Sequence, residues 1–181
     1  YTGVNEYLYE GSTPFTNNLI SMQYQIYRPF DSKPTTFQPI DTVGTLTVYK
    51  NPYTTSIGYG MKDEIKDWDY EDLNPFYVQN DLVEKAYGIS GLFRLQEVSQ
   101  PELNGCEMVS DNGMGEFIIE NKTSFADNVI FTVKAQETGD IYLHFDCSQA
   151  ENTVIERNGE EIMAGRLNGQ ILNLGKMKRG E

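Results

Sequence analysis

Apolar residues alternate with polar ones along most of the chain, in short runs that turn-forming residues separate. In residues 1–95 Asn, Pro and Gly punctuate these runs, and segments 20–26 and 46–48 place apolar side chains at every second position. A period of two puts such side chains on one face of an extended segment. The first half of the chain therefore predicts short, half-buried strands.

One helix is predicted over residues 75–87. Asn74 can cap its start, and Pro75 then occupies the first helical position, where a missing N–H costs nothing. Gly88 suits the left-handed conformation that ends many helices. Side chains three and four residues apart form an apolar stripe: Phe76, Gln79, Leu82, Val83, Ala86 and Tyr87.

From residue 112 onward the alternation becomes regular, and three segments carry apolar sets of period two: Phe117 and Ile119; Val129, Phe131 and Val133; Ile141, Leu143 and Phe145. Asn158-Gly159 is a strong hairpin signal, because both residues tolerate the positive φ of a type I′ turn. Several short strands at near-regular spacing indicate an antiparallel β-sandwich.

The pattern as a whole predicts a mainly β fold with two modules. Residues 1–95 form an α+β module that contains the helix. Residues 96–112 are rich in Pro, Gly and polar residues without periodicity, which is typical of a linker or inter-module loop. Residues 113–181 form an antiparallel β-sandwich or jelly-roll-like module, which we expect to be galactose-binding-like and truncated at its C-terminus.

Charge and composition narrow the classes of function. The chain has 14 Lys and Arg against 27 Asp and Glu, a net charge of −13. Proteins that bind nucleic acid draw affinity from basic side chains on phosphates, so we do not expect a nucleic-acid partner. No stretch reaches the 18 or so apolar residues of a membrane span. The chain lacks an initiator Met, and we expect it to be part of a longer protein.

Candidate chemistry is sparse. His144 is the only histidine, so a Ser–His–Asp or Cys–His arrangement is not expected, and we predict no catalytic residue, cofactor or metal. Cys106 and Cys147 can form one disulfide or remain two thiols. Residues 63–72 hold six acids around Trp68, the only tryptophan. Three interpretations of this acidic loop stay open. It can be a solvated surface loop, it can bind calcium although it lacks EF-hand spacing, or it can supply the two carboxyls of a glycosidase.

Three segments resemble the extracytoplasmic region of the YfhO family, large multi-span membrane proteins of mainly Gram-positive bacteria. They are residues 12–24 (STPFTNNLISMQY), residues 48–53 (VYKNPY) with 57–59, and the helix with its Asn74-Pro75-Phe76 start. The second half is similar to the family over residues 139–148, 158–159 and 174–176. Lys50 departs from the pattern, since an acidic residue usually precedes this Asn-Pro.

The resemblance implies a membrane core like that of a C-type glycosyltransferase, which uses lipid-linked sugars in cell-envelope glycosylation such as that of teichoic acids. No residue of this chain matches the catalytic acids of that core. The chain would then be a non-catalytic domain on the extracytoplasmic side of the cell membrane. Its partners would be the membrane-embedded remainder of the same chain and cell-wall glycan or lipid-linked sugar.

The resemblance also draws attention to aromatic residues flanked by acids and amides: Trp68 with Asp67 and Asp69, and Tyr53 with Asn51. Sugar C–H groups stack on aromatic rings, while hydroxyls bind neighbouring carboxylates and amides. These five are the candidate ligand-binding residues, although a tryptophan beside a helix start can also seal a core. Two alternative functions stay open: a stand-alone secreted carbohydrate-binding or adhesion protein, and a glycoside hydrolase that uses the 63–72 acidic loop.

Overall fold

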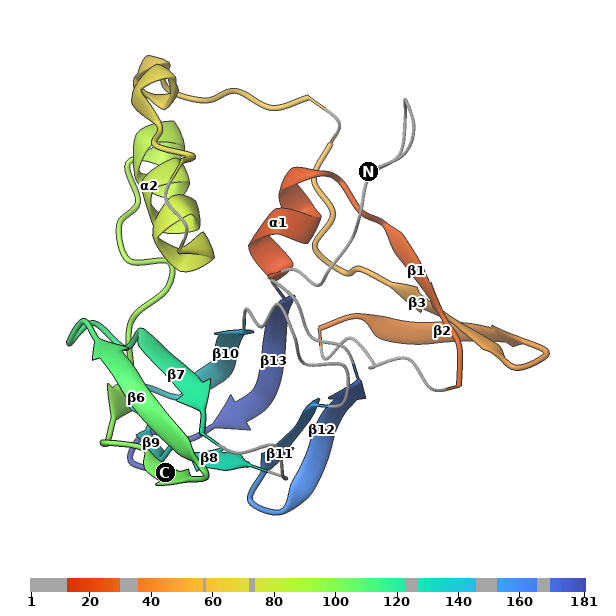
Figure 1. Cartoon of the computed structure of the whole chain (residues 1–181). Helices are drawn as coiled ribbons and strands as arrows, with labels where there is room; N and C mark the ends of the chain where they lie inside the picture. Colours follow the sequence, from red (N-terminus) through yellow and green to blue (C-terminus); the bar gives the residue numbers. More distant parts are fainter. Residues whose placement is uncertain are drawn as a thin grey trace, which may run out of the picture. The chain divides into compact units, whose positions relative to one another are not determined.

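The computed structural model of the chain describes residues 13–29, 36–56, 58–71, 74–122, 127–145, 153–165 and 170–181 (Figure 1). Strands make up 41% and helices 17%, and the sheets are antiparallel, which confirms the mainly β prediction. Contacts divide the chain into two compact units, residues 1–60 with 140–175 and residues 61–139 with 176–181. The expected modules 1–95 and 113–181, and the sandwich form of the second, stay predictions.

The first unit begins with helix α1 (Pro14–Leu19) and a three-stranded antiparallel sheet in the order β1-β3-β2. Its strands are β1 (Tyr24–Tyr27), β2 (Gln38–Val43) and β3 (Leu46–Lys50). Tyr49 is the buried residue of β3, and its ring meets that of Tyr27 edge-on at 5.3 Å between centroids. These two rings define the inner face of the sheet, because they lie on the side opposite exposed Ile26.

The strand expected over residues 20–26 is shorter than the alternation indicates. The Thr13 side chain accepts a hydrogen bond from the Thr16 backbone N–H. In return, the Thr13 backbone N–H donates to the Thr16 hydroxyl. This capping box, with proline at the first turn, starts helix α1, which ends at Leu19 with Ile20 as its C-cap. Ser21 then has φ +57°, which breaks the extended conformation before β1 begins.

The remaining strands of the first unit form two pairs. β10 (Gly139–Phe145) pairs with β13 (Gln170–Met177), and β11 (Thr153–Arg157) pairs with β12 (Glu160–Gly165). The β11–β12 turn has φ of +53° at Asn158 and +80° at Gly159. Positive φ at both central residues is the type I′ turn that the sequence predicts.

The second unit contains the predicted helix, α2 (Pro75–Tyr87), with the predicted caps. The Asn74 side chain accepts hydrogen bonds from the backbone N–H groups of Phe76 and Tyr77 at 3.0 and 3.3 Å. Gly88 ends the helix with φ +73°. The buried helix residues belong to the expected stripe: Gln79, Leu82, Val83 and Ala86. A 3-10 helix, η1 (Asp63–Asp67), packs against α2.

Six short strands complete the second unit as three antiparallel pairs. These pairs are β4 (Glu97–Val98) with β9 (Val133–Lys134), β5 (Glu102–Asn104) with β8 (Asn128–Ile130), and β6 (Cys106–Asp111) with β7 (Phe117–Asn121). Residues 96–112, expected to be a linker or loop, thus contain three strands. Two of them have only two or three residues, which is too short for a period of two to be visible in the sequence.

Replacing Asn74 with Ala should lower the free energy of unfolding by about 1 kcal/mol, because two N–H groups at the start of α2 lose their acceptor. Asn74→Ser is the matched control, since its hydroxyl can accept the same hydrogen bonds and should recover most of the loss. Urea denaturation of both variants measures the difference. Equal stability of the Ala and Ser variants would contradict the capping role.

Candidate functional site

Asn51, one of the five candidate residues, lies directly after β3 and is 2% exposed. Its side-chain NH₂ donates to Asn18 Oδ1 at 2.8 Å and to the Met22 carbonyl at 3.0 Å. Its side-chain oxygen accepts from the Tyr53 backbone N–H at 3.0 Å. A buried carboxamide with these partners stabilises the fold. Because the Asn51 side chain is buried, we do not include it in the ligand surface that we propose.

The residues that follow Asn51 bind the end of helix α1. The Thr55 hydroxyl donates to the Asn18 carbonyl, and the Tyr59 hydroxyl donates to the Leu19 carbonyl at 2.8 Å. The last carbonyls of a helix have no partner within the helix itself. Thr55 and Tyr59 thus supply hydrogen bonds that a six-residue helix cannot make internally. Tyr53 itself is 67% exposed, and its role as a ligand contact stays a prediction.

Trp68, in the second unit, is half-buried and held against α2. Its indole N–H donates to the Val78 carbonyl at 3.0 Å. The Asp69 backbone N–H donates to the Asp81 carboxylate at 2.9 Å, which ties the same segment to the helix a second time. The indole therefore packs on the helix and still keeps part of its surface in solvent, and its role as a ligand contact stays a prediction.

Tyr70 adds a second aromatic ring that the sequence analysis did not single out. The rings of Trp68 and Tyr70 lie 5.7 Å apart at 58°, and Tyr70 is 68% exposed. In an extended segment, residues two apart point to the same side. The Trp68-Asp69-Tyr70 spacing was the signal that could have identified the pair. We call these two residues the aromatic pair.

The two aspartates beside Trp68 are both exposed but differ in their contacts. The Asp69 side chain accepts from the Glu71 backbone N–H at 3.0 Å, so part of it stabilises the local turn. Asp67 ends η1 in solvent. The structure thus brings Asp67, Trp68 and Asp69 together with Tyr70 in the second unit, while Tyr53 and Asn51 belong to the first.

The remaining acids of the 63–72 stretch do not gather into a metal site in the part of it that the structure describes. No group of three or more His, Cys, Asp or Glu side chains suitable for a metal ion occurs among the described residues. Asp72 lies outside them. Glu64 lines a hollow of about 360 Å³ with Glu84, but Lys62 and Lys85 line it too. That mixture of charges gives no support to a dedicated glycosidase pair.

Cys106 is a free thiol, and Cys147 lies outside the described residues. The Cys106 sulfur is 3.7 Å from the Asn104 carbonyl and 3.8 Å from Asn121 Oδ1. Burial, and then the negative charge of Asp127, raise the pKa of the Cys106 thiol above its ordinary value. A raised pKa keeps the thiol protonated at neutral pH, where it is a poor nucleophile.

Comparison with known proteins identifies the family. The family model described as bacterial membrane protein YfhO matches residues 1–181, the whole chain. The chain therefore belongs to the YfhO family of bacterial membrane proteins. No curated protein and no solved structure matches it. Among the residues that the structure describes, no helix is long and apolar enough to span a bilayer.

Replacing Asn51 with Ala should lower the free energy of unfolding by about 2 kcal/mol, because the Met22 carbonyl and the Tyr53 N–H lose a buried partner. Exposed Asn104 is the control, and Asn104→Ala should change stability by less than about 0.5 kcal/mol. Thermal or urea unfolding compares the two variants. A loss of the same size at both positions would show that the Asn51 carboxamide has no special role.

Cys106 should react with iodoacetamide more slowly than glutathione does at pH 8, since its raised pKa lowers the thiolate fraction. The measurement uses a Cys147→Ser background, so that one thiol reacts. Asp127→Asn removes the nearby charge and should accelerate alkylation, whereas Glu84→Gln, the same change of charge on α2, should not. Unchanged kinetics in the Asp127 variant would exclude the electrostatic contribution.

Proposed function

We propose that this chain is an extracytoplasmic, non-catalytic domain of a membrane protein, and that its aromatic pair contacts cell-envelope glycan. The observation that carries the proposal is the position of the pair: two rings side by side, one fixed by hydrogen bonding to α2 and the other largely in solvent. Membership of a membrane protein family supports a location beside the envelope.

The geometry of the pair suits a sugar better than a deep apolar ligand. Tilted rings offer C–H groups of a pyranose a face to stack on, and both neighbouring aspartates can accept bonds from hydroxyls. Because two contacts hold residues 68–69 to the helix, little ordering of the protein is needed on binding. A shallow surface of this kind binds weakly.

Weak binding is sufficient for the role proposed. A domain tethered beside its polymer experiences an effective ligand concentration on the order of mM. In this proposal the glycosyl-transfer chemistry belongs to the membrane-embedded remainder of the same chain, which would act on lipid-linked sugar in teichoic-acid or related glycosylation. The present domain would hold acceptor or polymer near that chemistry.

Tyr70→Ala should weaken the binding of cell-wall or teichoic-acid oligosaccharides about threefold or more, which corresponds to roughly 0.7 kcal/mol of lost ring contact. Because Trp68 is the only tryptophan, intrinsic fluorescence of the chain reports ligand at this place directly. The titration follows that fluorescence, with isothermal calorimetry as a second readout.

Tyr53→Ala is the matched comparison, because Tyr53 is 67% exposed against 68% for Tyr70 and belongs to the other unit. It should leave oligosaccharide affinity unchanged. Loss of affinity in the Tyr53 variant alone would place the site at Tyr53 and contradict the role of the aromatic pair. An unchanged Trp68 signal with several mM of oligosaccharide would contradict it as well.

A further inference from the structure

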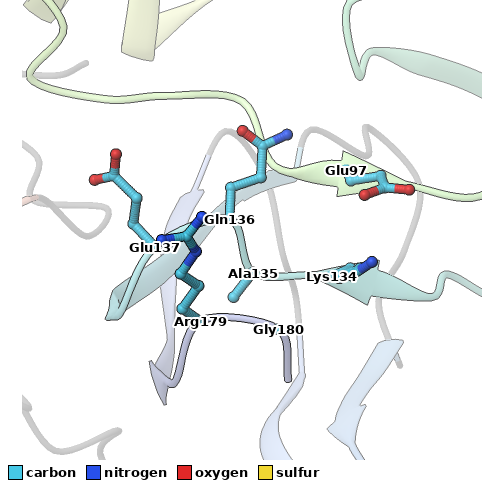
Figure 2. Close-up of a pocket in the computed structure, with 7 residues that line it drawn as sticks. All are labelled: Glu97, Lys134, Ala135, Gln136, Glu137, Arg179 and Gly180. Atoms are coloured by element: carbon cyan, nitrogen blue, oxygen red, sulfur yellow. The ribbon is translucent and has the colours of Figure 1, made fainter.

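A hollow of about 570 Å³ lies in the second unit, where β4 and β9 run beside the C-terminal residues (Figure 2). Lys134 is at the end of β9, and Gln136 follows it two residues later. Arg179 comes from the last residues of the chain. Ala135, which is 1% exposed, has only a methyl side chain and Gly180 has none, so neither fills the hollow. Glu97 and Glu137 complete the lining.

The charged groups around this hollow are not equivalent. Glu137 forms an ion pair with Arg94, so its charge is largely compensated. Glu97 stands directly opposite Lys134 in the β4–β9 register. No ion pair or side-chain hydrogen bond of Arg179 is found within the described part of the chain. With Glu137 compensated by Arg94, the charges that remain at the hollow are those of Lys134, Arg179 and Glu97, a net charge of +1, in a protein whose net charge is −13.

The donors at the hollow sit on backbone that is already fixed. The Ala135 N–H donates to the Glu181 carbonyl at 2.9 Å, and the Gly180 N–H donates to the Ala135 carbonyl at 2.7 Å. The Arg179 N–H donates to the Thr138 hydroxyl at 3.0 Å, and the Gln136 N–H to the Gln96 side-chain oxygen at 2.9 Å. The segments that carry Lys134, Gln136 and Arg179 are therefore bound to one another before any ligand arrives.

We propose that this hollow binds a phosphate group. An ammonium, a carboxamide and a guanidinium are all hydrogen-bond donors, and here they come from two separate segments of the chain. A tetrahedral phosphate accepts hydrogen bonds on several sides, whereas a planar carboxylate is satisfied by a single fork. Arginine combined with lysine is the usual recognition pair for phosphate oxygens. This inference does not rest on the aromatic pair.

Titration of the ¹⁵N-labelled 181-residue chain with inorganic phosphate, sn-glycerol 3-phosphate and glycerophosphoglycerol tests the proposal, with glycerol as the neutral control. The amide resonances of Ala135, Gln136 and Gly180 should shift with the phosphate compounds and not with glycerol. Binding of the diester as well as the monoester assigns the hollow to an internal phosphate of a polymer. Binding of inorganic phosphate and the monoester, without the diester, assigns it to a terminal phosphate.

Charge-removing variants show whether each side chain at the hollow strengthens or weakens phosphate binding. Lys134→Gln and Arg179→Gln should each weaken phosphate binding about tenfold, because each removes a charge-assisted hydrogen bond. Glu97→Gln should strengthen binding about twofold, since it removes a negative charge from the lining. Lys122→Gln is the matched control: it alters net charge as Lys134→Gln does, but Lys122 pairs with Glu107 and does not line the hollow.

Two results would overturn the proposal. The first is the absence of shifts at these three amides with 20 mM of every phosphate compound, a concentration about tenfold above a weak Kd in the mM range. The second is equal weakening by Lys122→Gln and Lys134→Gln, which would mean that phosphate responds only to the overall charge. Retained chemical-shift dispersion in each variant shows that it is folded, so a loss of binding is not a loss of structure.

Discussion

The hydrogen bonds of side-chain amides to backbone groups are the interaction on which both units depend. Elements this short leave many N–H and C=O groups without a partner in regular structure. At Asn51-Pro52 and Asn74-Pro75 the asparagine oxygen accepts from the N–H two residues later, in each case at 3.0 Å. The same local turn ends strand β3 in one unit and starts helix α2 in the other. Asn-Pro therefore fixes where an element stops or begins.

A second amide extends this principle to tertiary packing. Asn80, on α2, donates to the Phe93 carbonyl at 2.9 Å and accepts from the Phe93 N–H at 2.7 Å. These bonds hold the segment after the helix while Phe76 and Phe93 pack with centroids 5.3 Å apart. Large side chains that are fully buried are few among the described residues, so directional bonds carry much of the specificity. Surface groups are consequently held in place without a large core.

The parts of the structure that sequence predicted are those with local signals. Asn74, Gly88 and the Asn158-Gly159 turn each act on their immediate neighbours, and the structure has all three as expected. Strands β4 and β5, within residues 96–112, depend on partners 24 to 37 residues away, which no local pattern shows. For the candidate site, Trp68 could be identified from composition. The burial of Asn51, by contrast, depends on Asn18, a contact across 33 residues.

The proposed phosphate site is compatible with a strongly acidic protein, because salt limits the distance over which the overall charge acts. Charges separated by more than about 10 Å are screened at 0.1 M salt, so the overall charge of −13 acts weakly on a ligand in contact with Lys134 and Arg179. The acidic surface disfavours the binding of anions at random positions. Only donors held at a fixed spacing compensate for that repulsion. Specificity for phosphate would then depend on the backbone bonds at Ala135 and Gly180, which hold the two segments that carry the donors together, and not on the number of basic residues alone.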